Sequence, residues 1–126
     1  MINNFELEPE TIIILSLTYN EIVGIICLYD NKFLIEKLNK NNIPLEYYSL
    51  NNLHGCFIYN LCVHKFYRNN KIGHNLLKYC IKKMNKLNIE YLHSHVTNEI
   101  SKSLFLKNGF KNEKVLNNIN IMSKYL

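Results

Sequence analysis

The chain has 126 residues, of which 48% are hydrophobic and 20% are charged, a balance typical of a globular domain with a buried core. The net charge of +5 favours an anionic ligand, but the lysines are scattered and form no basic block that would indicate a nucleic-acid or membrane-surface protein. We therefore expect a single domain over residues 1–126 that binds neither nucleic acid nor membrane.

The cysteines indicate neither a zinc site nor a redox dithiol. Cys27, Cys56, Cys62 and Cys80 all lie in apolar runs, and no two of them are spaced as C-x-x-C. We expect buried, reduced thiols and no bound metal. The first ten residues are acidic and polar, unlike a signal peptide, and no apolar stretch reaches spanning length, so we expect an intracellular, cytoplasmic protein.

The first part of the chain is predicted to form two strands. Residues 11–30 hold two segments rich in β-branched side chains, joined by a turn at residues 19–21. Gly24, early in the second strand, indicates a bulge or a close backbone approach. Residues 31–53 are ambiguous, because "KFLIEKLNK" fits a short helix or a strand before asparagines and Pro44 break it.

The second part is predicted to alternate strands and helices. The strand "CFIYNLCV" is nearly continuous in apolar residues, as is typical of a strand covered on both faces. The amphipathic segment "GHNLLKYCIKKMNKL" and the strand "IEYLHSHV" follow, which predicts parallel strands joined by a right-handed crossover. A helix from about Asn98 to Asn108, ended by Gly109, precedes two last strands around a turn at residues 117–118.

The turn "FYRNNKIGH" carries the only arginine of the chain, Arg68, at the start of the first long helix. A helix N-terminus offers unpaired backbone N–H groups and the positive end of a dipole, so anions bind there. Arginine adds a rigid fork suited to phosphate, and Gly73 lets a phosphate approach the backbone without a Cβ in the way. These residues point to a phosphate or pyrophosphate site.

The segment "LCVHKFYRNNKIGHNLL" resembles the central motif of the GNAT superfamily of N-acetyltransferases, in which a strand of the type L-x-V precedes (R/Q)-x-x-G-x-(G/A). Arg68 and Gly73 match the first and last motif positions, and Lys71 replaces the middle glycine. The later segment "NEISKSLFLKNGF" resembles the family motif N-x-x-A-x-x-L-Y-x-K-x-G-F, with Phe105 in place of the tyrosine. The closing "INIMSKYL" resembles the last strand of the family, so the resemblance covers roughly residues 11–126.

The resemblance implies a fold and a co-substrate. The fold would be a GNAT-like α/β (α+β) arrangement: a mixed, mostly antiparallel twisted sheet with a central parallel, splayed strand pair and flanking helices. Acetyl-CoA would place its pyrophosphate on the arginine loop and its pantetheine arm between the two parting strands. The residues implied to bind it are Leu61, Cys62, Val63, Arg68, Asn69, Asn70, Lys71, Ile72, Gly73, His74, Asn98, Ser101 and Phe105.

The proton-transfer groups depart from the family pattern. The tyrosine that often protonates the leaving thiolate falls on Phe105, and a glutamate often found two residues before the L-x-V leucine falls on Tyr59. The catalytic candidates are Tyr59, as a relay through water, and His95, as a base, since histidine titrates near neutral pH; His54 is a weaker candidate. The alternatives are a packing role for Tyr59 and a plain surface location for His93 and His95.

The acceptor site is the least defined part of the sequence. Typical members begin with a strand and two helices that cover the acceptor, whereas only about ten residues precede the first predicted strand here. Residues 31–53, or a partner subunit in a homodimer, would replace that cover. We expect an acetyl-CoA-dependent N-acetyltransferase acting on a primary amine. A CoA-binding module with little or no transferase activity and a small basic nucleic-acid binder are the alternatives.

Overall fold

The computed structural model describes residues 12–48, 50, 54–68 and 71–126. The strands are β1 (Ile12–Thr18), β2 (Glu21–Asp30), β3 (Gly55–Val63), β4 (Tyr91–Val96), β5 (Lys111–Leu116) and β6 (Ile119–Tyr125). The helices are α1 (Asn31–Lys40), α2 (Ile72–Lys86) and α3 (Glu99–Lys107), with two short 3-10 turns at Leu45–Tyr47 and Lys65–Tyr67. None of the helices in these ranges combines the length and the apolar character that a membrane crossing requires.

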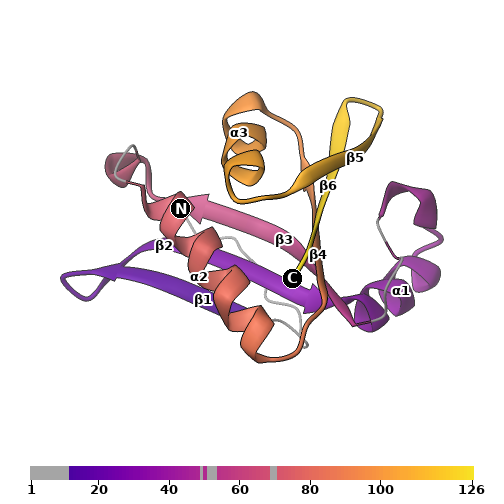
Figure 1. Cartoon of the computed structure of the whole chain (residues 1–126), viewed down its shortest axis with the longest axis horizontal. Coiled ribbons are helices and arrows are strands. Elements are labelled where there is room, and N and C mark those ends of the chain that lie inside the picture. Colours follow the sequence, from indigo (N-terminus) through magenta and orange to yellow (C-terminus); the bar gives the residue numbers. More distant parts are fainter. Residues whose placement is uncertain (1–11, 49, 51–53, 69–70) are drawn as a thin grey trace.

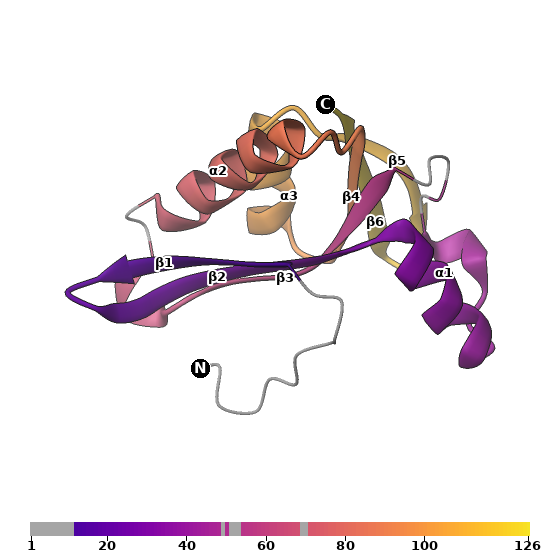
Figure 2. The ribbon, with the colours of Figure 1, turned by 90° about the horizontal axis from the view of Figure 1, so that it is seen from below.

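The strands form one mixed sheet in the order β1-β2-β3-β4-β6-β5 (Figure 1). Only β3 and β4 pair in parallel, and the other four pairings are antiparallel. Helices α2 and α3 lie on one face of the sheet, whereas α1 lies on the other (Figure 2). This is the mixed, mostly antiparallel sheet with a central parallel pair that the sequence predicts.

The β1–β2 hairpin brings α2 close to the sheet. Its turn residues Tyr19 and Asn20 both have positive φ, 50° and 65°, as a tight hairpin turn requires. The register shifts between Ser16 and Leu17 of β1, which leaves one extra residue on β2 just before Gly24. The bulge predicted at this glycine is therefore confirmed. A Cβ at Gly24 would also lie 2.8 Å from Cδ1 of Leu76 on α2, so the helix side chains pack closely over it.

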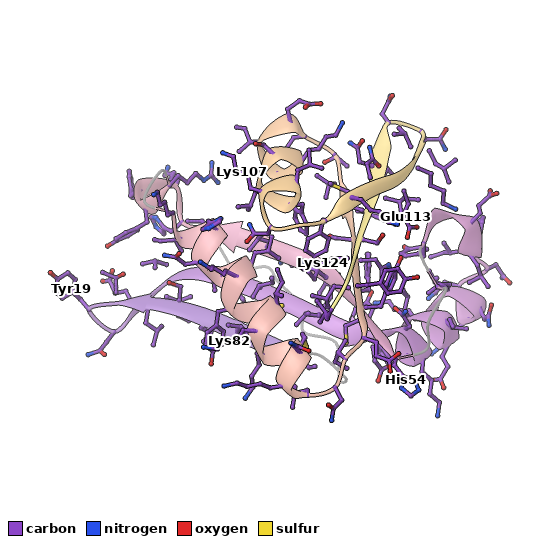
Figure 3. The ribbon with its side chains drawn as sticks, viewed as in Figure 1. Tyr19, His54, Lys82, Lys107, Glu113 and Lys124 are labelled. Atoms are coloured by element: carbon purple, nitrogen blue, oxygen red, sulfur yellow. The ribbon has the colours of Figure 1, made fainter. Side chains whose placement is uncertain are left out.

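The main core lies between the sheet and helices α2 and α3. Helix α2 buries four side chains at helical spacing, namely Leu76, Leu77, Cys80 and Met84. Lysines occupy its exposed outer surface, as Lys82 shows, and Lys107 lies likewise on α3 (Figure 3). Burial raises the pKa of the Cys56 and Cys80 thiols to about 12, so both are neutral thiols in this core.

The segment that the sequence left ambiguous between helix and strand is helical. Asp30 caps α1, because its side chain accepts a hydrogen bond from the Phe33 N–H at 2.7 Å. Leu34 and Leu38 are 1% and 2% exposed. They pack in a second, smaller cluster on the far face of the sheet, which we call the α1-side cluster. Its members are Tyr29, Leu34, Leu38 and Phe57, with Phe33, Tyr48, Leu50 and Tyr59 packed against them.

The close contact at Gly24 gives a stability prediction. Gly24→Val should lower the free energy of unfolding by about 1–3 kcal/mol, because its side chain would displace Leu76 and Ile72 of α2. Urea denaturation measures the loss. The matched control is Gly73→Ala, whose Cβ would meet other atoms only at 3.5 Å or more. In the helix that change should stabilise by about 0.5–1 kcal/mol. Equal stability of wild type and Gly24→Val would contradict the prediction.

Candidate functional site

A fork between β3 and β4 creates the site. The parallel pairing runs only from Gly55↔Tyr91 to Ile58↔Ser94, and at its end the Ser94 hydroxyl donates to the Ile58 carbonyl at 2.8 Å. The next residue of β3, Tyr59, is a bulge: its neighbours Ile58 and Asn60 pair with consecutive residues of β2. A bulge bends its strand and strengthens its twist, so β3 turns away from β4 at this point.

A polar cavity of about 140 Å³ lies in the fork. Its walls are the parted halves of β3 and β4 and the first turn of α3. The lining residues are Ile58, Tyr59, Asn60, Leu61, Ser94, His95, Val96, Thr97, Asn98, Ser101 and Phe105. Six residues predicted from the sequence to line the site therefore meet here, namely Tyr59, Leu61, His95, Asn98, Ser101 and Phe105.

Backbone groups at the end of β3 point into the fork. The His64 N–H donates to the Val23 carbonyl of β2 at 2.7 Å. Because successive residues of a strand direct their backbone groups to opposite sides, the N–H and C=O of Val63, and of Leu61 before it, point away from β2. The Val63 carbonyl accepts from Nε of Arg68 at 3.3 Å, which ties the arginine to the mouth of the fork. The backbone groups of Cys62 point the other way, toward β2.

The loop between β3 and α2 carries exposed cationic side chains, Arg68 and Lys71, at the helix start. Lys71, the N-cap of α2, adopts the left-handed conformation, with φ 61° and ψ 18°, and makes no side-chain capping hydrogen bond. The first-turn N–H groups, from Ile72 onward, are therefore not capped by the side chain that precedes them. The two remaining predicted binding residues of this loop, Asn69 and Asn70, lie outside the described residues.

His74 and Gly73 lie where α2 meets α3. Nδ2 of Asn108 lies 3.1 Å from Nδ1 of His74 and also donates to the Leu104 carbonyl at 2.9 Å. The half-buried imidazole thus joins the two helices. A Cβ at Gly73 would be in ordinary contact with Leu104 and Val63, so this glycine is not required by packing.

Helix α3 forms one wall of the cavity. The Asn98 side chain accepts from the Ser101 N–H at 2.8 Å, which confirms Asn98 as the N-cap. Phe105 is 3% exposed and packs edge-on against Phe110, with ring centroids 4.8 Å apart. The ring at this position therefore shapes the cavity but has no proton to donate. Gly109, with φ 87°, ends the helix as predicted.

Aromatic side chains surround the two catalytic candidates on the α1 side of the sheet. The ring of His95 lies 4.4 Å from that of Tyr48 and 5.2 Å from that of Phe57, measured between centroids. The ring of Tyr59 stacks on Tyr29 at 4.6 Å. The Tyr59 hydroxyl hydrogen-bonds the thiol of the neighbouring Cys27, whose pKa is nevertheless raised by burial. His95 and Tyr59 thus both line the cavity with their rings held by neighbours.

His93 corrects the surface location expected for this histidine. It is fully buried, because α1 covers its face of β4. Its Nε2 lies 2.5 Å from Oδ1 of Asn31, the first residue of α1, and its Nδ1 has no hydrogen-bond partner. Burial above all, together with the neighbouring His95 and against the opposing effect of Glu113, lowers the pKa of His93 to about 3. His93 is therefore a neutral structural residue.

Sequence reasoning missed Asn31 and Tyr48, which both lie in the segment left ambiguous. The signal for the helix was present: Asp30 as N-cap and apolar residues at helical spacing, Leu34 and Leu38. No local sequence pattern, however, predicts the contact between Tyr48 and His95. That contact depends on how the segment between β2 and β3 packs against the sheet.

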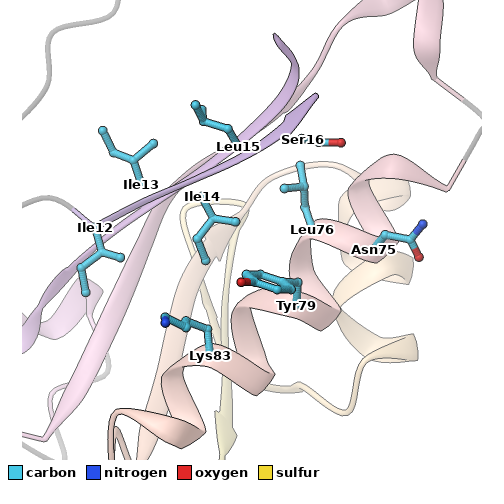
Figure 4. A pocket seen from close by; sticks show the side chains of 9 residues that line it. All are labelled: Ile12, Ile13, Ile14, Leu15, Ser16, Asn75, Leu76, Tyr79 and Lys83. Carbon is cyan, nitrogen blue, oxygen red and sulfur yellow. The ribbon is translucent and has the colours of Figure 1, made fainter. Parts of the chain in front are cut away.

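A larger cavity of about 530 Å³ lies elsewhere, between the edge strand β1 and helix α2 (Figure 4). Aliphatic side chains of β1 form one side, and Asn75, Tyr79 and Lys83 of α2 form the other. Its lining includes neither the parted strands nor the first residues of a helix. We therefore place the candidate site at the smaller cavity in the fork.

A comparison with protein families finds one family that matches most of the chain. A family model described as Acetyltransferase (GNAT) family matches residues 1–110. No curated protein matches the chain at the level of sequence.

Solved structures share the fold at low sequence identity. One is the paia N-acetyltransferase from Thermoplasma acidophilum in complex with coenzyme A, with TM-score 0.70 and 23% identity over 93% of this chain and 62% of that one. Another is Tetrahymena GCN5, with TM-score 0.68 and 18% identity over 94% and 69%. A third is the ribosomal-protein-S18-alanine N-acetyltransferase from Escherichia coli, with TM-score 0.69 and 13% identity over 94% and 71%. The chain thus spans less than two thirds of the Thermoplasma protein.

The buried His93 predicts an acid-sensitive stability. Its pKa is about 3 in the folded chain against an ordinary 6.5, so below pH 6.5 the unfolded chain binds a proton that the folded chain does not. The free energy of unfolding should fall by up to about 1.4 kcal/mol per pH unit between pH 6.5 and 3. Urea denaturation at pH 7 and pH 5 measures this. His93→Gln should reduce the loss, since glutamine has no group that titrates in this range. An unchanged loss in His93→Gln would refute the assignment.

The left-handed Lys71 gives a second stability prediction. A side chain in this conformation costs about 1–2 kcal/mol, and glycine does not bear that cost. Lys71→Gly should therefore raise the free energy of unfolding by about 1 kcal/mol, after allowance for the greater freedom of glycine in the unfolded chain. Lys71→Ala is the matched control: it removes the charge but keeps the Cβ, so it should give no gain. Equal stabilisation by both changes would assign the effect to charge instead.

Proposed function

The chain belongs to the GNAT family of acetyltransferases, and on this premise we propose that it transfers the acetyl group of acetyl-CoA to a primary amine. The observation that carries the proposal is the fork: parallel pairing of β3 and β4 stops at Ile58↔Ser94, and a polar cavity opens beside the N-terminus of α3. Exposed backbone groups at the end of β3 and cationic side chains at the start of α2 lie on either side of the mouth.

The residues of this chain fit the two parts of coenzyme A. The pyrophosphate would bind the N–H groups at the start of α2, with Arg68 and Lys71 supplying charge. Gly73 would let it approach the helix closely, and Asn69 and Asn70 belong to the same loop. The pantetheine arm would extend along the backbone of β3 and pair with Leu61 and Val63. The backbone of Cys62 between them faces β2, which corrects the expectation that it binds the arm. Ser101, Asn98 and Phe105 would bound it on the α3 side, and Ile72 and His74 near the phosphate end.

The reaction needs few protein groups. The amine nitrogen forms a bond to the thioester carbonyl carbon, the C–S bond breaks, and coenzyme A leaves as a thiolate. The Val63 N–H, directed into the fork, would stabilise the negative charge that develops on the carbonyl oxygen. Holding the amine and the thioester together in one cavity would supply most of the remaining rate acceleration.

Two protons must move in this reaction. His95 would take the proton that the amine loses, because its ring lines the cavity from β4. The leaving thiolate would take a proton from Tyr59 through water, since Tyr59 lines the cavity from the β3 bulge. Phe105 cannot serve as the acid. His95 on β4 would thus act as the base, and Tyr59 on β3 would act as the acid.

A CoA-binding module with little or no transferase activity is the second candidate. The buried phenylalanine at position 105 favours it, because the ring at that wall of the cavity carries no hydroxyl group. The two candidates differ in one measurable respect, the dependence of CoA release on an added amine.

The deciding experiment combines calorimetry with thiol detection. The protein is titrated with acetyl-CoA and then supplied with a panel of primary amines, including alkyl amines, amino sugars and peptides. The proposed function predicts binding of acetyl-CoA and release of free thiol that requires both protein and amine. Binding without any amine-dependent thiol would establish the module instead, and absence of binding would contradict both.

Variants locate the binding site. Arg68→Ala should weaken acetyl-CoA binding by about tenfold or more, because a charge-assisted hydrogen bond to phosphate contributes about 1.5–3 kcal/mol. Adding Gly73→Asp should abolish measurable binding, since a carboxylate would face the pyrophosphate. Lys82→Ala, on the exposed surface of the same helix, is the control for net charge and should bind like wild type. Unaltered affinity in the double variant would rule out this site.

A further inference from the structure

Tyr48 is the residue of the segment between β2 and β3 that reaches the proposed base. Its ring lies 4.4 Å from the ring of His95 at an interplanar angle of 35°, and 5.2 Å from Phe57 at 74°. Phe57 in turn meets His95 edge-on at 72°. The imidazole is thus in contact with a tilted tyrosine ring and with a phenylalanine ring nearly perpendicular to its own plane.

The segment that carries Tyr48 is anchored by the helix that precedes it. Helix α1 precedes it, and Leu34 and Leu38 anchor that helix in the α1-side cluster. The bond between Asn31 and His93 ties the start of α1 to β4, two residues from His95. Burial raises the pKa of Tyr48, so its phenol stays neutral and packs through its ring.

We propose that Tyr48 is the positioning residue for His95: by packing its ring against the imidazole it fixes the plane of that ring, so that a ring nitrogen faces the amine in the fork. The inference rests on the proposed function, in which His95 takes the proton from the amine. Rotation about the bond between Cβ and an imidazole ring has broad wells, so an unsupported histidine samples many ring planes. Two aromatic contacts restrict that rotation: one from Tyr48, in the segment before β3, and one from Phe57, on β3.

The kinetic test compares two changes at one position. Tyr48→Leu removes the aromatic ring and should lower kcat for the amine by about tenfold or more, because a misplaced base loses most of its contribution. The KM for acetyl-CoA should stay unchanged, since Tyr48 is not among the residues proposed to bind the cofactor. Tyr48→Phe keeps the ring and should retain wild-type kinetics. Tyr79→Leu, an exposed tyrosine on α2, is the control for loss of a surface ring.

A double-mutant cycle shows whether Tyr48 acts through His95. If it does, Tyr48→Leu should cause no further loss of kcat in a His95→Gln background. Losses that multiply in the double variant would overturn the proposal. So would a Tyr48→Phe variant as impaired as Tyr48→Leu, since that would assign the effect to the hydroxyl group.

A spectroscopic measurement separates this inference from the proposed function. In wild type the ring current of Tyr48 should displace the NMR resonances of the His95 ring, identified by their loss in His95→Gln. Tyr48→Leu should move these resonances, and Tyr48→Phe should leave them nearly in place. Immobile resonances in Tyr48→Leu would overturn the positioning role. A wild-type protein that releases no CoA with any amine, yet shows the displaced resonances, would instead overturn the proposed function while keeping the contact.

Discussion

The bulge at Tyr59 is the constraint on which the candidate site depends. Up to Ile58, β3 pairs with a neighbour on each side, and its backbone groups are used in the sheet. One extra residue in the pairing with β2 bends the strand, and from there the groups facing β4 have no strand to bond. The residues past the bulge are only half-buried, so these backbone groups stay accessible to a ligand. The fork therefore suits a ligand that can itself pair with a strand, as the amide-bearing arm of coenzyme A would under the proposed function.

The sequence predicted the parts of this arrangement that rest on local chemistry. The apolar strand, the amphipathic helix and the next strand predicted the parallel pair, and Asn98 with Gly109 predicted both ends of α3. The loop around Arg68 predicted where α2 begins, and the anion site at that helix start stays a prediction. These signals lie within a few residues of the structure they specify, so they can be read without knowing which elements pack together.

The remainder of the site depends on contacts between distant segments. His93 and His95 alternate on one strand, yet one is fully buried and the other lines the cavity, because α1 covers only part of that face. Asn31 lies far from His93 in the sequence and forms its partner through the packing of α1. The conformation of Lys71 also could not be predicted from its residue type. The motif position is usually a glycine, and Lys71 keeps the positive φ of that position although it has a side chain.

The sheet divides the molecule into two compartments. The main core, under α2 and α3, supports the arginine loop and the wall formed by Phe105, whereas the α1-side cluster supports Tyr48 and Tyr59. The two clusters pack on opposite faces of the sheet and meet at the cavity in the fork, so a substitution deep in one need not disturb the other. Under the proposed function, residues that select the amine can change on the α1 side while the residues that bind the acetyl donor stay the same.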